Sequence, residues 1–304
     1  MQIYLPVAEI SIDAFLLLGL GGMIGVLSGM FGIGGGFMMT PLLIFIGIPA
    51  PVAVGTQTNS VIASSVSGAM AHWPRGNVDI KMGLVLLVGG LLGSSLGVMV
   101  FSWLKSLGQI DVAIKLIYVA TLGTVGSLML AEAVRSVFRR RRKIPARKKL
   151  HTHHWVHGLP FKMRFRKSRL YISALLPLAV GFGVGFLSAM MGIGGGFMIV
   201  PAMIYLLGMP TTVVIGTSLF QIIFVAANVT FLQAWENQTV DVVLALLLLA
   251  GSVVGAQIGT RLGARLQSDA LRLLLALLVL LVGGKLTYDL FTPPVDVYVL
   301  GSGL

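Results

Sequence analysis

Two stretches of the chain share one unusual pattern: GMFGIGGGFMMTP at residues 29–41 and AMMGIGGGFMIVP at residues 189–201. Each places three consecutive glycines inside an apolar segment, with a proline five residues after the last glycine. A glycine in a helix interior costs roughly 1 kcal/mol relative to alanine. Adjacent glycines also do not form one helix face, as small residues spaced by four do. We therefore predict that a helix breaks at each stretch. Close helix packing is the simpler alternative.

The composition is typical of a polytopic membrane protein. Of 304 residues, 56% are hydrophobic and 11% are charged, and the mean hydropathy is +0.95. A soluble domain of this size does not need so much apolar surface. The first apolar segment begins near residue 11 without a basic stretch before it, so we expect it to be retained as a span. The chain contains no cysteine, and we expect no cofactor and no metal site.

The two glycine stretches belong to a repeat of the whole chain. At an offset of 160, residues 25–41 and 185–201 are identical at twelve of seventeen positions. Further along, GTQTNS at 55–60 corresponds to GTSLFQ at 216–221, and NVD at 77–79 corresponds to TVD at 239–241. We therefore divide the chain into a first transmembrane repeat (11–133), a basic loop (134–170) and a second transmembrane repeat (171–291).

The apolar segments predict an all-α fold with eight long spans and two short ones. The long segments can each cross about 30 Å as a helix. They lie at 11–31, 52–72, 82–104, 112–133, 171–191, 212–234, 242–265 and 270–291. The short segments, 36–48 and 196–208, follow the glycines and are closed by prolines.

The topology depends on whether the short segments cross. If they do not cross, the two halves are parallel, and if they do, the halves are inverted. Fourteen of the 22 Lys and Arg residues lie between 135 and 169, with no acidic residue among them, so the loop is predicted to be cytoplasmic. Only the inverted arrangement then places the basic turn at 261–272 inside, and Glu236 and Asp241 outside. We therefore favour inverted halves.

A broken helix suggests a binding site. The helix that restarts after the break directs an N-terminus, with partial positive charge, toward the break. Two such ends from inverted halves would meet near the membrane midplane, which suits a small anion. The residues expected at this site are Gly34, Gly35 and Gly36 in the first half, and Gly194, Gly195 and Gly196 in the second.

Uncharged polar side chains begin the next long span of each half. We expect them to lie beside the gap in the broken helices and to contact the anion. They are Thr56, Gln57, Asn59, Thr217, Ser218 and Gln221. Helix capping and hydrogen bonds between helices are the alternative roles. For Gly89, Gly93 and Gly97, and for Gly251, Gly255 and Gly259, the spacing of four predicts helix packing instead.

Other functional classes are disfavoured. The glycines are not followed by the Lys-Ser or Lys-Thr of a phosphate-binding loop. The spans contain no acid–base pair, activated nucleophile or metal triad, which speaks against an enzyme. The basic loop is expected to bind anionic lipid rather than nucleic acid. The oligomeric state stays open, and a homodimer is one arrangement that the sequence allows.

Two halves that each carry G-x-G-G-G-x-x-x-x-P, followed by a Gly-Thr stretch at the next span, resemble the TauE/SafE sulfite exporter family of bacterial membrane permeases. The resemblance covers the chain outside the 135–170 loop. It implies export of small sulfur-containing anions, such as sulfite or organosulfonates, across the bacterial inner (plasma) membrane. Our hypothesis is a secondary transporter that works by alternating access. An anion channel, or a permease for another small anion, is the alternative.

Overall fold

The structure, a computed structural model, describes residues 2–31, 36–74, 76–141, 161–165, 167–168, 170–263 and 268–292. The first half begins with a hairpin of β1 (Gln2–Leu5) and β2 (Ile10–Asp13). Five helices follow. They are α1 (Ala14–Phe31), α2 (Gly36–Phe45), α3 (Ala50–His72), α4 (Ile80–Ser106) and α5 (Ile110–Arg141).

The second half repeats this order. It begins with a hairpin of β3 (Lys162–Phe165) and β4 (Leu170–Ser173). Its helices are α6 (Leu175–Met191), α7 (Gly196–Tyr205), α8 (Thr211–Leu232), the π-helix η2 (Gln233–Asn237), α9 (Val242–Gly263) and α10 (Ser268–Phe291). The hairpins were not predicted. Gln2 pairs with Asp13, and Lys162 pairs with Ser173, so the offset of 160 extends to residues before the expected repeat boundaries.

The protein is a mostly helical, multi-pass membrane protein, but its spans differ from the predicted set of eight long and two short segments. In the described residues, five helical segments are long and apolar enough to cross a membrane: 80–106, 110–131, 213–237, 242–259 and 273–291. Helices α1 and α6 contribute shorter apolar segments because strands β2 and β4 take up the first residues of the predicted spans 11–31 and 171–191. Helix α3 is 23 residues long but more polar than these five. Helices α2 and α7 have ten residues each, which is about 15 Å or half of a bilayer core.

The two halves are joined because the first helix of each half packs against the fourth helix of the other half. Helix α1 packs along α9 of the other half, and α6 packs along α4. The glycines spaced by four lie at these contacts, as predicted. A Cβ atom at Gly93 would overlap the Phe182 carbonyl oxygen, and one at Gly255 would overlap the Gly22 carbonyl oxygen. These glycines therefore let two backbones touch.

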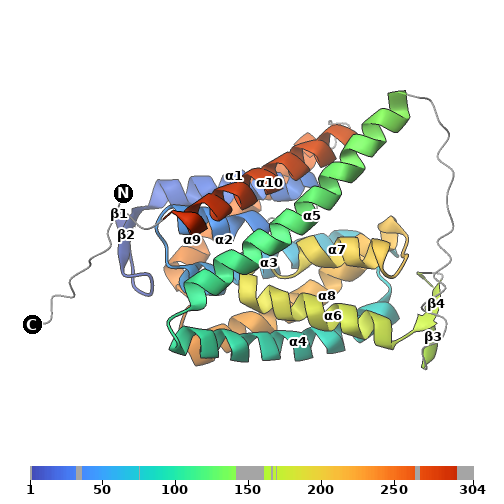
Figure 1. The fold of residues 1–304 in the computed structure, drawn as a ribbon, viewed down its shortest axis with the longest axis horizontal. Helices are drawn as coiled ribbons and strands as arrows, with labels where there is room; N and C mark the ends of the chain where they lie inside the picture. The colour runs from blue at the N-terminus through green and yellow to red at the C-terminus, as the bar shows by residue number, and fades with distance from the viewer. Residues whose placement is uncertain are drawn as a thin grey trace, which may run out of the picture.

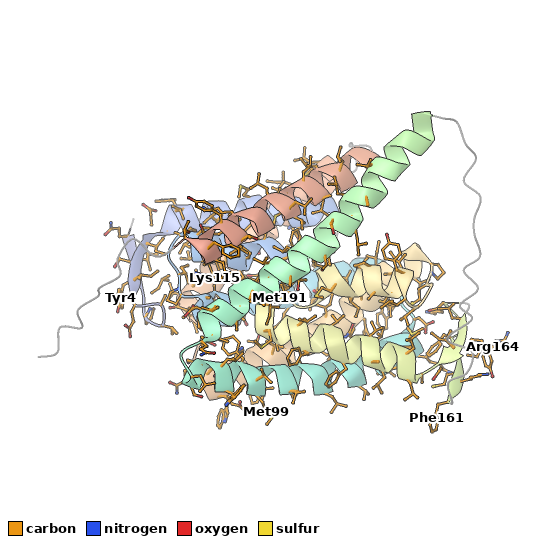
Figure 2. The ribbon with its side chains drawn as sticks, viewed as in Figure 1. Tyr4, Met99, Lys115, Phe161, Arg164 and Met191 are labelled. Atoms are coloured by element: carbon orange, nitrogen blue, oxygen red, sulfur yellow. The ribbon has the colours of Figure 1, made fainter. Side chains whose placement is uncertain are left out.

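Equivalent helices of the two halves run in opposite directions where they meet. Along α5 and α10, Gly126 faces Val279 while Leu122 faces Gly283. Along α3 and α8, Gly68 faces Leu219, and the start of α3 meets the residues that follow α8. Figure 1 shows the same relation, with the β1–β2 hairpin at one end of the bundle and the β3–β4 hairpin at the other. Tyr4 and Arg164 mark these two hairpins in Figure 2.

The packing of α6 on α4 predicts a sharp difference between two glycines of α6. A Cβ atom at Gly185 would meet the backbone of Gly90, whereas one at Gly183 would meet nothing within 4 Å. We expect Gly185→Ala to lower the free energy of unfolding by about 1–3 kcal/mol through overpacking. We expect Gly183→Ala to be neutral, or to stabilise by up to about 1 kcal/mol. Thermal unfolding in detergent measures both, and equal effects of the two variants would contradict the assigned packing.

Candidate functional site

The second glycine stretch separates two helices. Helix α6 ends at Met191, and α7 begins at Gly196. Between them, Gly192, Gly194 and Gly195 have φ angles of 71°, 69° and 80°. Residues other than glycine rarely adopt this left-handed region. In the first half, α1 ends at Phe31 and α2 begins at Gly36. The predicted site residues Gly34 and Gly35 lie outside the described residues.

The helices that follow the two stretches meet at their starts. The rings of Phe37 and Phe197, which are equivalent in the repeat, stack with centroids 4.6 Å apart. Both side chains are buried. A Cβ atom added at Gly36 would lie 2.8 Å from the carbonyl oxygen of Ile193 in the second stretch. The second glycine stretch and the start of α2 are therefore in contact inside the bundle.

A small cavity with a volume of about 30 Å³, partly open to its surroundings, lies beside Gly36. Three helices of the first half, α1, α2 and α3, line it together with α9 of the second half. Its polar lining residues are Ser28, Gln57, Ser60, Ser64 and Ser252. The remaining described lining residues are glycine or apolar, and none of the described lining residues is ionisable. Two predicted site residues, Gly36 and Gln57, lie here.

Two buried groups of this cavity have no hydrogen-bond partner among the described residues: the amide Nε2 of Gln57 and the hydroxyl of Ser60. Gln57 is fully buried, and Ser60 is 6% exposed. A buried polar group without a partner costs about 1–3 kcal/mol, and such groups are rare in native proteins. These two groups can therefore serve a bound molecule that carries hydrogen-bond acceptors.

Other polar groups of the cavity are already engaged. The hydroxyl of Ser64 donates to the Val61 carbonyl at 3.0 Å, and that of Ser252 donates to the Leu249 carbonyl at 3.0 Å. Each retains lone pairs but has used its only proton. The two buried lining donors without a described partner, those of Gln57 and Ser60, are both on α3, next to the start of α2.

Thr56 and Thr217 do not line this cavity. Each joins the two halves instead. The N–H of Asp241 donates to Thr56 Oγ1 at 2.9 Å, and the N–H of Asp79 donates to Thr217 Oγ1 at 3.0 Å. The four residues are buried, and the two bonds are equivalent in the repeat. Each threonine thus pairs with the residue that precedes the fourth helix of the other half.

The two aspartates also hold the hairpins. Asp241 Oδ2 accepts a bond from the N–H of Val7 at 3.0 Å. Asp79 Oδ2 accepts bonds from the N–H and hydroxyl of Ser168, at 2.9 and 2.6 Å. Each aspartate therefore ties a hairpin of the other half to the start of its own helix. We call each arrangement of aspartate, threonine and hairpin a clasp.

The other predicted site residues lie apart from the cavity lining. Asn59 donates to the Thr56 carbonyl of its own helix at 3.2 Å, and Ser218 donates to the Ile215 carbonyl at 2.9 Å. Gln221 Nε2 donates to the Leu86 carbonyl at 3.3 Å, while its Oε1 has no partner. In the second stretch, a Cβ atom at Gly195 would lie 2.8 Å from Val184 Cγ1. The described cavity is therefore built mainly from the first half.

Four serines of the cavity were not predicted as site residues. Ser28 belongs to the repeated LSGM and LSAM segments, where Ser188 is its equivalent. Ser60 and Ser64 follow Gln57 by three and seven residues, which places all three on one face of a helix. These patterns are visible in the sequence. Ser252 has no such signal because it reaches the cavity only through the packing of α9 on α1.

The chain was compared with known proteins. A family model described as "Sulfite exporter TauE/SafE" matches residues 17–286. The "Probable membrane transporter protein YunE" of Bacillus subtilis is 27% identical over 283 residues, which cover 90% of this chain and 97% of that protein. The "Probable membrane transporter protein YjnA" of the same organism is 28% identical over 273 residues, which cover 90% and 98%. A "Probable membrane transporter protein" of Xylella fastidiosa is 31% identical over 244 residues, which cover 78% and 80%. No solved structure matches the chain.

The cavity predicts unequal reactivity at two equivalent serines. Ser28 lines the cavity, whereas Ser188 is 1% exposed. In this cysteine-free chain, we expect Ser28→Cys to react several-fold faster than Ser188→Cys with a small charged thiol reagent. The rates are measured by mass spectrometry on detergent-solubilised protein without substrate. Equal rates would contradict the assignment of the cavity to the first half.

The clasp predicts that Thr217 acts on stability. Thr217→Val removes the acceptor of the Asp79 N–H bond, and the unpaired buried group should lower the free energy of unfolding by about 1–3 kcal/mol. The exposed Thr124, whose hydroxyl bonds only within its own helix, provides the control Thr124→Val. Thermal unfolding and substrate affinity are measured together. Normal stability with weakened substrate binding would instead make Thr217 a ligand contact.

Proposed function

The chain belongs to the TauE/SafE sulfite exporter family, and we propose that it is a secondary transporter that exports small sulfur-containing anions such as sulfite or organosulfonates. The family is one of membrane transporters and not of enzymes. The relatives' names specify membrane transport and leave the substrate open. The substrate must therefore be argued from the cavity.

One observation carries the proposal: the cavity holds buried hydrogen-bond donors without partners. Gln57 Nε2 offers two N–H groups and Ser60 one O–H group, and neither has a partner in the part of the chain that the structure describes. They lie beside Gly36, where α2 begins. A helix N-terminus adds partial positive charge. An oxyanion supplies several acceptor oxygens and would satisfy these donors together.

The chemistry of the lining also favours an anion over a cation. A cation site is typically built from carboxylate and carbonyl oxygens directed into the cavity, and no carboxylate is among its described lining residues. A lining of neutral donors and small residues suits a compact oxyanion such as sulfite, or the sulfonate group of a larger molecule. We propose that Gly36, Gln57 and Ser60 contact the anion, together with Gly34 and Gly35, which precede α2.

Alternating access is supported by the arrangement of the halves. Equivalent helices run in opposite directions at α5–α10 and α3–α8, which is the relation expected of inverted repeats. Helices α2 and α7 are each about half a membrane thick, and they meet at Phe37 and Phe197. We propose that the two inverted halves rock about this contact and expose the anion to each side in turn.

The orientation follows from charge. The turn before α4 lies beside the β3–β4 hairpin, because Lys167 donates to the Val78 carbonyl at 3.0 Å. Of the basic loop, the described residues Lys162 and Arg164 are exposed at that end. We propose that this end faces the cytoplasm at the bacterial inner membrane, where its positive charge would attract anionic lipid.

The proposal is tested by flux into liposomes that contain the purified protein. Sulfite, sulfate, thiosulfate, sulfoacetate and an aryl sulfonate are each offered with and without a pH gradient. We expect saturable flux of at least one of them. In Gln57→Glu, a carboxylate replaces the unpartnered amide and repels the anion, so we expect at least a tenfold loss of kcat/KM, or about 1.4 kcal/mol. Gln109→Glu adds the same charge at an exposed turn and should retain full flux.

The outcomes separate the alternatives. Flux that rises linearly with concentration and shows no counter-flow stimulation would favour an anion channel over a transporter. Full flux in Gln57→Glu would exclude the cavity as the anion site. Absence of flux with every anion, in wild-type protein shown to be folded, would overturn the assignment to sulfur anions.

A further inference from the structure

The amide of Gln57 presents one particular end to the cavity. A glutamine amide has a donor end and an acceptor end of nearly the same shape, so its orientation decides which kind of ligand it can bind. Here Oε1 accepts a hydrogen bond from the Thr40 hydroxyl at 2.7 Å. Nε2 remains without a partner and lies 2.6 Å from the position of a Cβ atom added at Gly36. The donor end is therefore the one at the start of α2.

Thr40 has a single proton and several acceptors within reach, and its hydroxyl also interacts with that of Tyr118. Gln57 Oε1 lies 2.7 Å from its Oγ1, and the carbonyl oxygen of Met191 lies 3.3 Å away. That carbonyl already accepts a bond from the Tyr118 hydroxyl at 2.6 Å. Because Tyr118 satisfies the Met191 carbonyl, the Thr40 proton is available to Gln57. Figure 2 shows Met191 inside the bundle beside α5, the helix that carries Tyr118.

All four residues of this network are fully buried or nearly so. Bulk water is therefore excluded from these bonds. In the opposite amide orientation, Thr40 would accept from Nε2, and Oε1 would face the cavity. A carbonyl oxygen there repels an anion and favours a donor or a cation. The direction of the Thr40 hydrogen bond thus decides whether the Gln57 amide favours an anion or a cation in the cavity.

We propose that Thr40 and Tyr118 determine the anion selectivity of the cavity by fixing the donor end of the Gln57 amide toward the ligand. They are positioning residues, because neither is among the residues that line the cavity. The inference rests on the proposed function of the cavity as an anion site. The ligand class is a small oxyanion whose oxygens accept from the Gln57 amide and the Ser60 hydroxyl.

The network joins Thr40, Gln57 and Tyr118 of the first half to the Met191 carbonyl of α6, and it is not repeated at the equivalent positions of the second half. At the offset of 160, Thr40 corresponds to Val200, which has no hydroxyl. The aligned Gly-Thr stretches place Ser218 at the position of Gln57, and Ser218 bonds to its own helix. A role in the common scaffold would require equivalent groups in both halves. Because the positions equivalent to Thr40 and Gln57 lack these groups, we associate the network with the cavity, which is asymmetric too.

The test compares Thr40→Val with the conservative Thr40→Ser by liposome flux of the anion that the wild type carries, with sulfite tried first. Thr40→Val frees the amide to reverse and removes one buried hydrogen bond. We expect its KM to rise about tenfold, or about 1.4 kcal/mol, with kcat nearly unchanged. Thr40→Ser restores the hydroxyl and should return KM to the wild-type value.

Tyr118→Phe provides a second, independent variant. Loss of its hydroxyl leaves the Met191 carbonyl open to the Thr40 proton, so KM should rise by a smaller factor of about three. The exposed Tyr288, 68% accessible on α10, provides the control Tyr288→Phe, which should not change KM. Because Tyr118→Phe removes only one atom, it keeps the inference testable if Thr40→Val does not fold.

A double-mutant cycle decides the mechanism. In a Gln57→Leu background, where the amide is absent, Thr40→Val should add little to the change in KM. Additive effects would overturn the orienting role of Thr40. If Gln57→Leu raises KM but Thr40→Val and Tyr118→Phe do not, only this inference is wrong. If Gln57→Leu itself has wild-type KM, or if no anion is carried, the proposed site or function fails first.

Discussion

Backbone contact between helices of opposite halves is the constraint on which the rest of the structure depends. Helix α1 is pressed against α9, and α6 against α4, at glycines that leave no room for a Cβ atom. In a lipid bilayer the hydrophobic effect does not drive helices together, because lipid tails are as apolar as the helices. Close van der Waals packing is therefore a main source of helix association. The packing of α1 on α9 also builds the cavity. Gly25 of α1 touches the backbone of Ser252, and both residues line it. The cavity therefore exists only because the halves are joined in this way.

The frame is symmetric, but the cavity is not. The two clasps use equivalent residues, with Asp79 bonded to Thr217 and Asp241 bonded to Thr56. The described cavity lies mainly in the first half, where the unpartnered amide of Gln57 is found. A duplicated scaffold thus supplies the architecture twice, while the hydrogen-bonding groups at the aligned positions have diverged. Two equivalent sites would hold two anions, whereas one asymmetric cavity suits a single substrate that passes between the halves.

The sequence predicted the membrane class, the repeat and the packing glycines because each leaves a periodic or compositional signal. It did not predict the hairpins, since strands of four residues are too short for such a signal. The repeated Gly-Thr and x-Val-Asp motifs were both recognised. Their connection was missed because Thr56 meets Asp241 of the other half, and one chain's sequence does not state which distant segments touch. Gln57 was expected in the site because it belongs to the Gly-Thr stretch. Ser252 was not, because it reaches the cavity only through the contact of α9 with the other half.

A transporter cavity built from neutral donors follows from the requirement to release its ligand. A buried lysine or arginine would bind an oxyanion strongly, but its charge would be left uncompensated whenever the cavity is empty, at a cost of several kcal/mol. An unpartnered amide or hydroxyl costs only about 1–3 kcal/mol in the empty state, and water can relieve part of it. The free energies of the loaded and empty cavity therefore stay close. In the proposed site, Gln57 and Ser60, aided by the start of α2, would attract an anion without retaining it. On this argument, selectivity has to come from the direction of hydrogen bonds, and the Thr40 bond that orients Gln57 becomes as important as the groups that touch the ligand.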